Sequence, residues 1–180
     1  MNRIPQSNGG GNKKTSPKAT DNSRYAGSFV KRNRRRIIVG REDKSALNTC
    51  LAGENCKYNG GNNRNEKILR LMEENEVIMV CLEQLGGLPT PRVPSEIKDG
   101  VVTAKDGRIV DAEFRAGAAK CLEIAIRKKP DLIILQSRSP SCGVKQRYDG
   151  TFTGTLVDGA GVAAQLLMDH GFRCLDVEEL

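Results

Sequence analysis

The sequence predicts an α/β fold: a three-layer, Rossmann-like domain with a mostly parallel sheet, joined to a disordered basic N-terminal tail. Two segments have the length and composition of strands that are buried on both faces: the continuous apolar run at residues 77–82, and residues 131–137, which contain Leu-Ile-Ile-Leu. Segments with apolar residues at helical spacing lie between and beyond these runs. Strands that alternate with helices in this way build layered folds around a parallel sheet.

Local signals delimit the other elements. Asp111 is a suitable N-cap for a helix that Pro130 ends, and Gly171 closes the last helix. An Asp-Gly pair between two β-rich pieces indicates a small hairpin or an extended arm. The further predicted elements are a short strand at 36–39, a helix at 65–74, the hairpin at 101–110, helices at 111–129 and 161–170, and a final strand at 172–177.

The positive charge of the chain is concentrated in the N-terminal tail. Residues 1–36 hold ten Lys and Arg and one acid, Asp21, so they carry +9, whereas residues 37–180 carry −2 of the net charge of +7. The tail has too little apolar surface to offset the entropy of ordering, so we expect it to be disordered. The folded domain is expected to span residues 37–180.

Three interpretations of this tail are open. A solvated extension without a function is the favoured one, since chain termini are often of this kind. The positive charge also suits attachment to nucleic acid, which is less favoured. The Arg- and Ser-bearing, acid-poor composition fits organelle targeting as well.

Composition argues against several classes of protein. Hydrophobic residues make up 38% of the chain, which is enough for one core. No apolar run approaches the roughly eighteen residues of a membrane span, and no apolar stretch of the secretory type follows the first basic residues, so we expect a cytoplasmic protein with reduced thiols. The absence of Trp and the small number of Phe and Tyr argue against a base-stacking surface for single-stranded nucleic acid.

Four of the six cysteines lie at turn-like breaks in the chain. Cys50 and Cys56 share the block CLAGENCKYNGG, Cys81 begins CLEQLGGLPTPR, and Cys142 lies in SRSPSCG. Gly, Pro, Ser and Asn surround these thiols, which is typical of loops and not of a core. Thiolates that converge from several loops indicate a metal or an iron–sulfur cluster.

The other two cysteines and the single histidine fit structural roles. Cys121 lies at helical spacing with apolar neighbours and Cys174 lies in the final strand, as expected of buried free thiols. Zinc is weakly supported, because Cys50 and Cys56 have five residues between them and not the two of a typical knuckle. His170 falls in a last helical turn, where it can interact with the helix dipole, so a catalytic role is disfavoured.

The expected topology brings the loop cysteines together. In parallel sheets, binding sites form beyond the carboxyl ends of the strands. Cys81 closes one predicted strand, the Cys142 loop follows another, and the block with Cys50 and Cys56 follows the first apolar run. We therefore expect these segments to meet at one sheet edge.

The glycine-rich segment 149–162 precedes and opens the last helix. Two interpretations are open: the segment binds an anion or lines a pocket, or it is only a long turn before the helix.

In this order and combination, four blocks resemble the thiouracil desulfidase family: the three cysteine blocks and YDGTFTGTLVDGAGV, which precedes the last helix. The resemblance covers about residues 37–178. It implies a 4Fe-4S cluster that is held by Cys50, Cys81 and Cys142, with the fourth iron left open. Cys56 is then an extra thiol close to the cluster. The residues of the first block alone leave open whether Cys50 or Cys56 is its ligand, and Cys50 is favoured.

The same resemblance implies a reaction on a small thiolated pyrimidine. In the family the open iron takes the substrate's sulfur, as a Lewis acid does, and a carboxylate and a serine assist; these correspond to Glu83 and Ser139. Glu83 takes an acid or base role if burial raises its pKa. Ser139 donates a hydrogen bond or relays a proton. The reaction is hydrolytic: thiouracil and water give uracil and hydrogen sulfide, without net electron transfer.

Two departures from the family pattern occur, one at a single residue and one at a pair of residues. The family usually has Pro where Leu82 stands, and Ser-Ala where Asn48-Thr49 precede Cys50. The Glu83 carboxylate and the Cys50 loop are therefore the places where the geometry, and with it the substrate, can differ from the family.

Two other functions are kept as alternatives. One is a binding module or sensor that holds a metal or a cluster without catalysis, in which case the tail serves nucleic-acid attachment. The other is desulfuration of thiolated bases within tRNA, for which the tail supplies affinity for the backbone. Salt-dependent retention of RNA or DNA that is lost without residues 1–36 favours the first. A comparison of free 4-thiouracil with thiolated tRNA separates the second from free-base chemistry.

Overall fold

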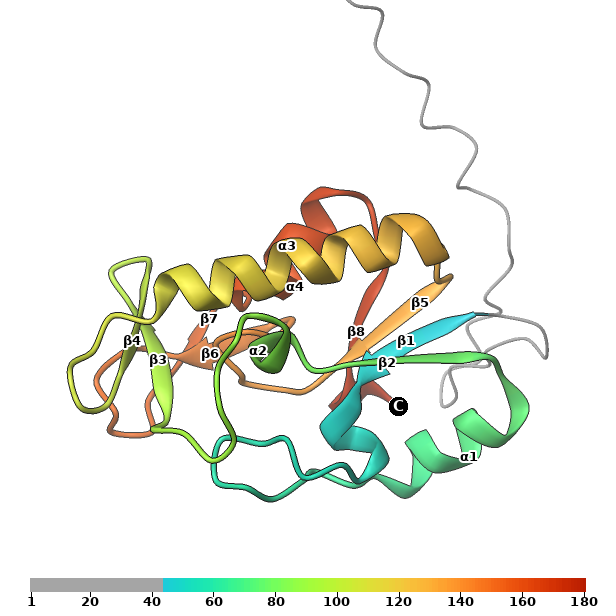
Figure 1. Ribbon diagram of the computed structural model, residues 1–180, viewed down its shortest axis with the longest axis horizontal. Coiled ribbons are helices and arrows are strands. Elements are labelled where there is room, and N and C mark those ends of the chain that lie inside the picture. Colours follow the sequence, from blue (N-terminus) through green and yellow to red (C-terminus); the bar gives the residue numbers. More distant parts are fainter. Residues whose placement is uncertain (1–43) are drawn as a thin grey trace, which may run out of the picture.

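A parallel four-stranded sheet lies at the centre of the computed structural model, which describes residues 44–180 (Figure 1). The strand order is β2-β1-β5-β8, and all three pairings are parallel. The strands are β1 (Ser45–Asn48), β2 (Val77–Val80), β5 (Leu132–Leu135) and β8 (Cys174–Asp176). The predicted tail, the domain boundary at residue 37 and the predicted strand at 36–39 lie outside the described residues.

Helices cover both faces of this sheet, so the predicted three-layer α/β architecture is confirmed (Figure 1). The helices α3 (Asp111–Lys128) and α4 (Val162–Asp169) pack on one face, and α1 (Glu66–Glu74) packs on the other. Within β5, successive residues alternate between the two cores: Ile133 faces α3 and α4, while Ile134 faces α1. No helix within residues 44–180 combines the length and the apolar composition needed to cross a membrane.

The predicted helices are confirmed to within one or two residues. The Asn65 side chain caps α1 by accepting a hydrogen bond from the Lys67 amide at 2.9 Å. Asp111 was predicted as the N-cap of α3, but this prediction is wrong. The N-cap is Val110, and Asp111 is the first residue of the helix. The Asp111 carboxylate instead accepts a hydrogen bond from the Val102 amide at 3.1 Å and so fastens the start of α3 to a neighbouring hairpin.

The prediction of a doubly buried strand at residues 77–82 is wrong in two respects. The strand β2 ends at Val80, and a short helix, α2 (Leu82–Leu85), begins two residues later. β2 also lies at the edge of the sheet, and Met79 is 46% exposed. Leu82 is buried, but in the contact between α2 and the core, so the apolar run spans two elements. An apolar run without periodicity does not distinguish these cases.

Two antiparallel hairpins flank the carboxyl edge of the sheet (Figure 1). The first hairpin turns at Asp99-Gly100, one Asp-Gly pair earlier than predicted. The chain also turns back at the predicted Asp106-Gly107 pair, where the Ala104 amide donates to the Arg108 carbonyl at 2.8 Å and the Val110 amide donates to the Val102 carbonyl at 3.0 Å, on either side of an isolated Thr103–Ile109 bridge. The second hairpin lies where a long loop was expected. The hairpin strands are β3 (Ser95–Lys98), β4 (Val101–Ala104), β6 (Gln146–Tyr148) and β7 (Leu156–Asp158).

Two glycines allow α2 to lie directly on α3. A Cβ atom on Gly117 would lie 2.0 Å from the Leu82 carbonyl oxygen, and one on Gly86 would lie 2.1 Å from the Glu113 carbonyl oxygen. Both neighbours are backbone atoms, which cannot turn aside. Since Cys81 precedes α2 and is its N-cap, this backbone contact positions that cysteine.

We expect Gly117→Ala to lower the free energy of unfolding by about 1–3 kcal/mol, because α2 must move to admit the methyl group. Chemical denaturation of the parent and the variant measures the difference. Ala119→Ser, on the exposed side of α3, is the matched control and is expected to change stability by less than about 0.5 kcal/mol. Equal stability of parent and Gly117→Ala would contradict the tight packing of α2 on α3.

Candidate active site

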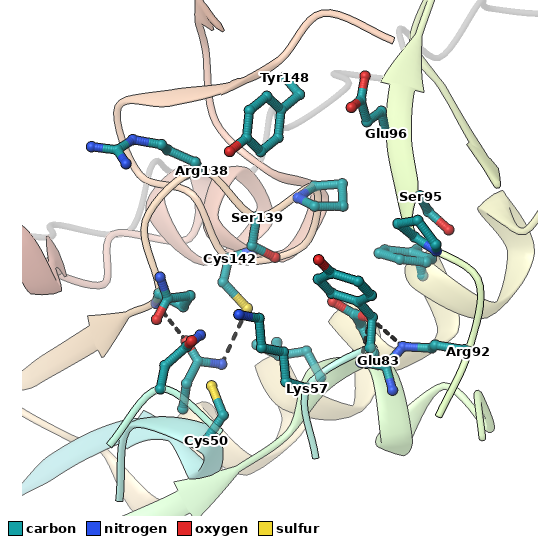
Figure 2. A pocket seen from close by; sticks show the side chains of 18 of the residues that line it. Cys50, Lys57, Glu83, Arg92, Ser95, Glu96, Arg138, Ser139, Cys142 and Tyr148 are labelled. Carbon is teal, nitrogen blue, oxygen red and sulfur yellow. Dashed lines mark hydrogen bonds and ion pairs between the residues drawn. The ribbon is translucent and has the colours of Figure 1, made fainter. Parts of the chain in front are cut away.

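A cavity of about 460 Å³ lies beyond the carboxyl ends of β1, β2 and β5 (Figure 2). β1 pairs with β2 on one side and with β5 on the other, so the strand order reverses here. Ligands of open α/β sheets bind at such a switch point. Asn48, the last residue of β1, and Gln136, the first residue after β5, both line the cavity. The site therefore lies at the sheet edge where the strand-end argument placed it. The strand that leads into the Cys50 block is β1, however, which was not predicted, and not the apolar run at 36–39.

The structure brings the four loop cysteines together in this cavity. Cys50 lies in a 3-10 turn, η2 (Thr49–Ala52), directly after β1. Cys81 lies between β2 and α2, and Cys142 lies in the loop that follows β5. Cys56 comes from the loop after η2. All of these thiols are free.

The remaining cysteines and the histidine lie away from the cavity. Cys121 is buried in the core between the sheet, α3 and α4, and Cys174 packs against the same core. Both therefore have the structural role that was predicted. His170 is the C-cap of α4, where its Nδ1 atom lies 2.8 Å from the Leu166 carbonyl oxygen.

Cys56 lies between two of the predicted ligands. Its thiol is within hydrogen-bond reach of the Cys50 and Cys81 thiols, and the contact with Cys50 is the main reason that its pKa rises to about 11. The contact with Cys56, followed by burial, raises the pKa of Cys81 as well. Thiols in this state must release protons when they bind a metal.

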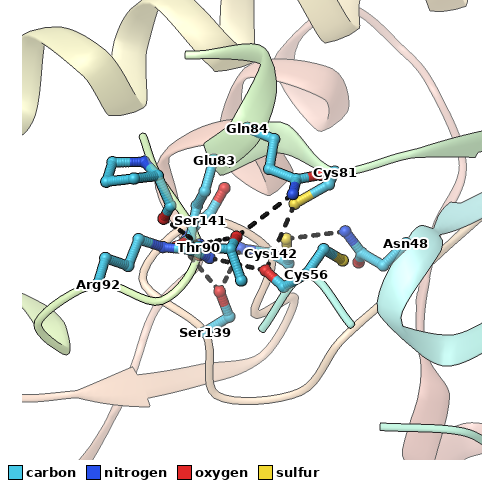
Figure 3. A network of polar contacts seen from close by, with 11 residues as sticks. Asn48, Cys56, Cys81, Glu83, Gln84, Thr90, Arg92, Ser139, Ser141 and Cys142 are labelled. Atoms are coloured by element: carbon cyan, nitrogen blue, oxygen red, sulfur yellow. Dashed lines mark hydrogen bonds and ion pairs between the residues drawn. The ribbon is translucent and has the colours of Figure 1, made fainter. Parts of the chain in front are cut away.

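Cys142 is held in a deeply buried, tightly turned loop. Cys142 is 5% exposed, and burial is the main cause that raises the pKa of its thiol. The Asn48 side chain donates a hydrogen bond from Nδ2 to the Cys142 sulfur at 3.1 Å (Figure 3). Gly143 follows because no other residue fits: a Cβ atom there would lie 2.5 Å from the Gln146 carbonyl oxygen.

Ser139 shapes the same loop and faces the cavity (Figure 2). Its Oγ atom accepts hydrogen bonds from the backbone amides of Ser141 at 3.1 Å and Cys142 at 3.2 Å. A serine hydroxyl has two acceptor positions and one donor. Both acceptor positions are thus used by the loop, and the O–H is left to donate.

Glu83 forms a buried ion pair with Arg92 (Figure 2). Arg92 contacts the Glu83 Oε2 atom at 2.6 Å, and the two side chains are 8% and 16% exposed respectively. Burial raises the pKa of Glu83, and the guanidinium of Arg92 opposes this shift. The Nε and Nη2 atoms of Arg92 both contact Oε2 of Glu83, so Oε1 is the oxygen that is available to a ligand.

Arg92 also connects the loops around the cavity (Figure 3). Its remaining donors reach the Cys56 carbonyl oxygen at 3.1 Å, the Pro89 carbonyl oxygen at 3.0 Å and the Thr90 hydroxyl at 3.1 Å. No role for Arg92 was predicted from the sequence. The available signal was its position at the end of the Gly- and Pro-rich block that begins with Cys81.

The glycine-rich segment lines the cavity and is not only a turn. It contributes Phe152 and Gly154 to the wall, and Tyr148, the last residue of β6, lines the wall directly before it. Glu96 of β3 holds this segment in place, because its carboxylate accepts hydrogen bonds from the backbone amides of Gly150 and Phe152, each at 3.0 Å. The other charged or aromatic residues that line the cavity are Lys57, Tyr58, Lys105, Phe114 and Arg138.

The donor set of the cavity consists of four thiols and two buried carboxylates, Glu83 and Glu96. The Glu96 carboxylate is already engaged by the backbone amides of Gly150 and Phe152, so Glu83 is the carboxylate that remains for chemistry. Sulfur ligands of this kind suit iron–sulfur clusters and soft metals. Within residues 44–180, no three Cys, His, Asp or Glu side chains have the arrangement of a site for one metal ion.

The chain is similar to known proteins in both sequence and structure. The family model for 2-thiouracil desulfurase matches residues 46–179. The uncharacterized protein YbbK of Bacillus subtilis (strain 168) is 40% identical over 145 residues, which cover 74% of this chain and 95% of that protein. Among solved structures, the 4Fe-4S-dependent thiouracil desulfidase TudS matches with a TM-score of 0.73 and 32% identity, over 77% of this chain and 93% of that chain.

The fold and the site define an α/β protein with a thiol-lined cavity at the switch point of its sheet. The chain belongs to the 2-thiouracil desulfurase family. The resemblance seen in the sequence is thereby confirmed.

Proposed function

We propose that this protein is a cluster-dependent desulfidase, which converts a small thiolated nucleobase such as thiouracil to the oxo compound and hydrogen sulfide. One observation carries the proposal: thiols from three separate loops and a buried carboxylate line one cavity at the sheet's switch point. Family membership and the likeness to TudS support it.

Cys50, Cys81 and Cys142 are the proposed ligands of a 4Fe-4S cluster. Each comes from the end of a different strand, and a cluster distributes its thiolates over separate irons, whereas a single ion gathers them around one atom. Three protein ligands leave one iron position for substrate. When bound, the cluster supplies a Lewis-acidic iron that polarises a thiocarbonyl sulfur.

Glu83 is the proposed general base. Its Oε1 atom accepts a proton from water, and the water oxygen attacks the ring carbon that bears sulfur. The Arg92 guanidinium fixes the carboxylate through Oε2 and keeps it oriented. Leu82, which stands where the family usually has Pro, does not turn Glu83 away from the cavity.

Ser139 is the proposed hydrogen-bond donor to the substrate. Because its acceptor positions are occupied by the backbone amides of Ser141 and Cys142, the hydroxyl points its proton toward an acceptor such as a ring nitrogen or exocyclic atom. The atoms balance: the oxygen of water replaces sulfur on the ring, and both hydrogens of water leave with sulfur as hydrogen sulfide.

Anaerobic reconstitution with iron and sulfide tests the proposal. We expect a brown protein with an iron–sulfur absorption band and about four irons per chain. It should release sulfide and uracil from 2- or 4-thiouracil. A protein that takes up no iron would exclude the cluster. A cluster-bearing protein that releases no sulfide would indicate the binding module or sensor. Turnover of thiolated tRNA alone would indicate the RNA-level enzyme.

We expect Cys56→Ser to retain the parent's iron content and sulfide release. Cys56 is 4% exposed and its thiol lies beside the proposed ligands, but it is assigned as their neighbour and not as a ligand. Iron and sulfide analysis of the reconstituted variant checks this. Loss of the cluster from Cys56→Ser, together with retention in Cys50→Ser, would show instead that Cys56 is the ligand from the first cysteine block.

A further inference from the structure

We propose that Asn48 is a positioning residue for the cluster, which sets the reduction potential and the lability of the Cys142 ligand through a hydrogen bond to its sulfur. This inference rests on the proposed function, since it requires a cluster on Cys142. The carrying observation is the 3.1 Å contact from Asn48 Nδ2 to Cys142 Sγ (Figure 3).

The orientation of the Asn48 amide is determined by its second hydrogen bond. Its Oδ1 atom accepts a hydrogen bond from the Gln136 backbone amide at 2.8 Å. A backbone N–H can only donate, so the oxygen must face Gln136, and the NH₂ group must face the sulfur. Asn48 is 3% exposed, and water therefore has little access to either group.

The position of Asn48 makes this donor rigid. Asn48 ends β1 and Gln136 follows β5, so the amide ties two paired central strands together at the point where the strand order reverses. Cys142 lies in a loop, while the donor to its sulfur is fixed to the sheet. Donors that are fixed to regular elements hold a site more accurately than donors in loops.

A donor at this place has a defined effect on a ligated thiolate. The hydrogen bond withdraws negative charge from sulfur, which favours the more negative, reduced cluster over the oxidised one, so the potential rises. The same bond orients the ligand and slows its loss, as outer hydrogen bonds do at other metal centres. The Ser141 hydroxyl also lies beside the Cys142 thiol and contributes in the same direction.

Two substitutions separate the donor from the structural link. Asn48→Asp keeps the shape and the acceptor for Gln136 but replaces the donor by a carboxylate oxygen. Asn48→Ala removes both groups. We expect the midpoint potential of both reconstituted variants to fall, with the one-electron reduction equilibrium shifting about tenfold, equal to about 59 mV. Iron loss to a chelator should also be faster than in the parent.

Asn75→Ser is the control, because Asn75 is a partly buried Asn that donates to the Leu71 carbonyl at 2.8 Å and lies outside the cavity. It should keep the parent's potential. If Asn48→Asp and Asn48→Ala bind a cluster with the parent's potential, the inference is overturned while the proposed function stands. If the parent itself binds no cluster, both the proposed function and this inference are overturned.

A measurement on the unmutated protein covers the case in which the variants do not assemble a cluster. The chain is labelled with ¹⁵N in asparagine side chains, and the reduced, paramagnetic cluster is studied by pulsed electron paramagnetic resonance. We expect a ¹⁵N coupling from the Asn48 amide through the hydrogen bond to sulfur. A cluster whose spectrum contains no coupling from labelled asparagine would overturn the inference.

Discussion

Substitution of Cys50, Cys81 or Cys142 by Ala is expected to abolish cluster binding and, with it, sulfide release. Each proposed ligand comes from a different loop, so the loss of one thiol leaves two protein ligands, which are too few to hold the cluster. Iron and sulfide analysis after anaerobic reconstitution, with the absorption spectrum, measures the loss.

The matched controls are Cys121→Ala and Cys174→Ala. Both thiols are free and pack against the apolar core outside the cavity, so these substitutions remove the same chemical group without touching the site. We expect the parent's iron content and a modest loss of stability of about 1 kcal/mol, as is usual when a small apolar group is removed from a core.

The pattern of iron contents over these variants decides between assignments. Loss in the three cavity variants and retention in the two core variants supports the proposed ligand set. Retention of iron in Cys81→Ala or Cys142→Ala would remove that residue from the set and leave a site of another composition. Reduced iron in Cys121→Ala would show that the assay reports stability and not ligation.

The location of the site was predictable because it depends on local patterns and one topological rule. The strand before Cys81 and the strand before the Cys142 loop could both be predicted from their apolar residues. Because parallel strands place their carboxyl ends on one edge of the sheet, the two loops were expected to meet there. The composition around each thiol distinguished the loop cysteines from Cys121 and Cys174. The resemblance then supplied roles for Glu83 and Ser139 that local patterns alone do not give.

The polar contacts within the site were not predictable, because they join residues that are distant in the chain. Asn48 reaches a sulfur 94 positions away, and Arg92 reaches both Glu83 and the carbonyl oxygen of Cys56, 36 positions away. Nothing in the neighbourhood of these residues in sequence marks such pairings. The β6–β7 hairpin was missed for a similar reason: its strands have three residues each and are half-buried or exposed, so they carry no apolar alternation.

The Glu83–Arg92 pair explains how a carboxylate can be both buried and reactive. Removal from water favours the protonated acid, and the adjacent guanidinium favours the carboxylate. Burial is the larger influence here, so the pKa lies above the ordinary 4.5. A carboxylate with a raised pKa is a stronger base than a solvated one, and this property suits the activation of water.

We expect Glu83→Gln to lower the rate of sulfide release by about 10²–10⁴-fold, the usual contribution of a general base. The amide keeps the size of the side chain but cannot accept a proton from water. The cluster content is expected to match the parent's, because Glu83 is not a proposed ligand. Steady-state kinetics on the reconstituted variant, normalised to iron, measures the effect. Glu123→Gln, on the exposed face of α3, is the control and should leave the rate unchanged.

The role of Glu83 as a base also predicts how the parent's rate of sulfide release depends on pH. A general base acts in its ionised form, so the rate should fall as the pH is lowered through the pKa of Glu83, which burial places above 4.5. Arg92→Met removes the charge that stabilises the carboxylate and should move this fall to higher pH. Glu83→Gln should lack this limb of the profile altogether. A variant that keeps both the rate and the acid limb of the parent would remove Glu83 from the mechanism and leave water activation to another group of the cavity.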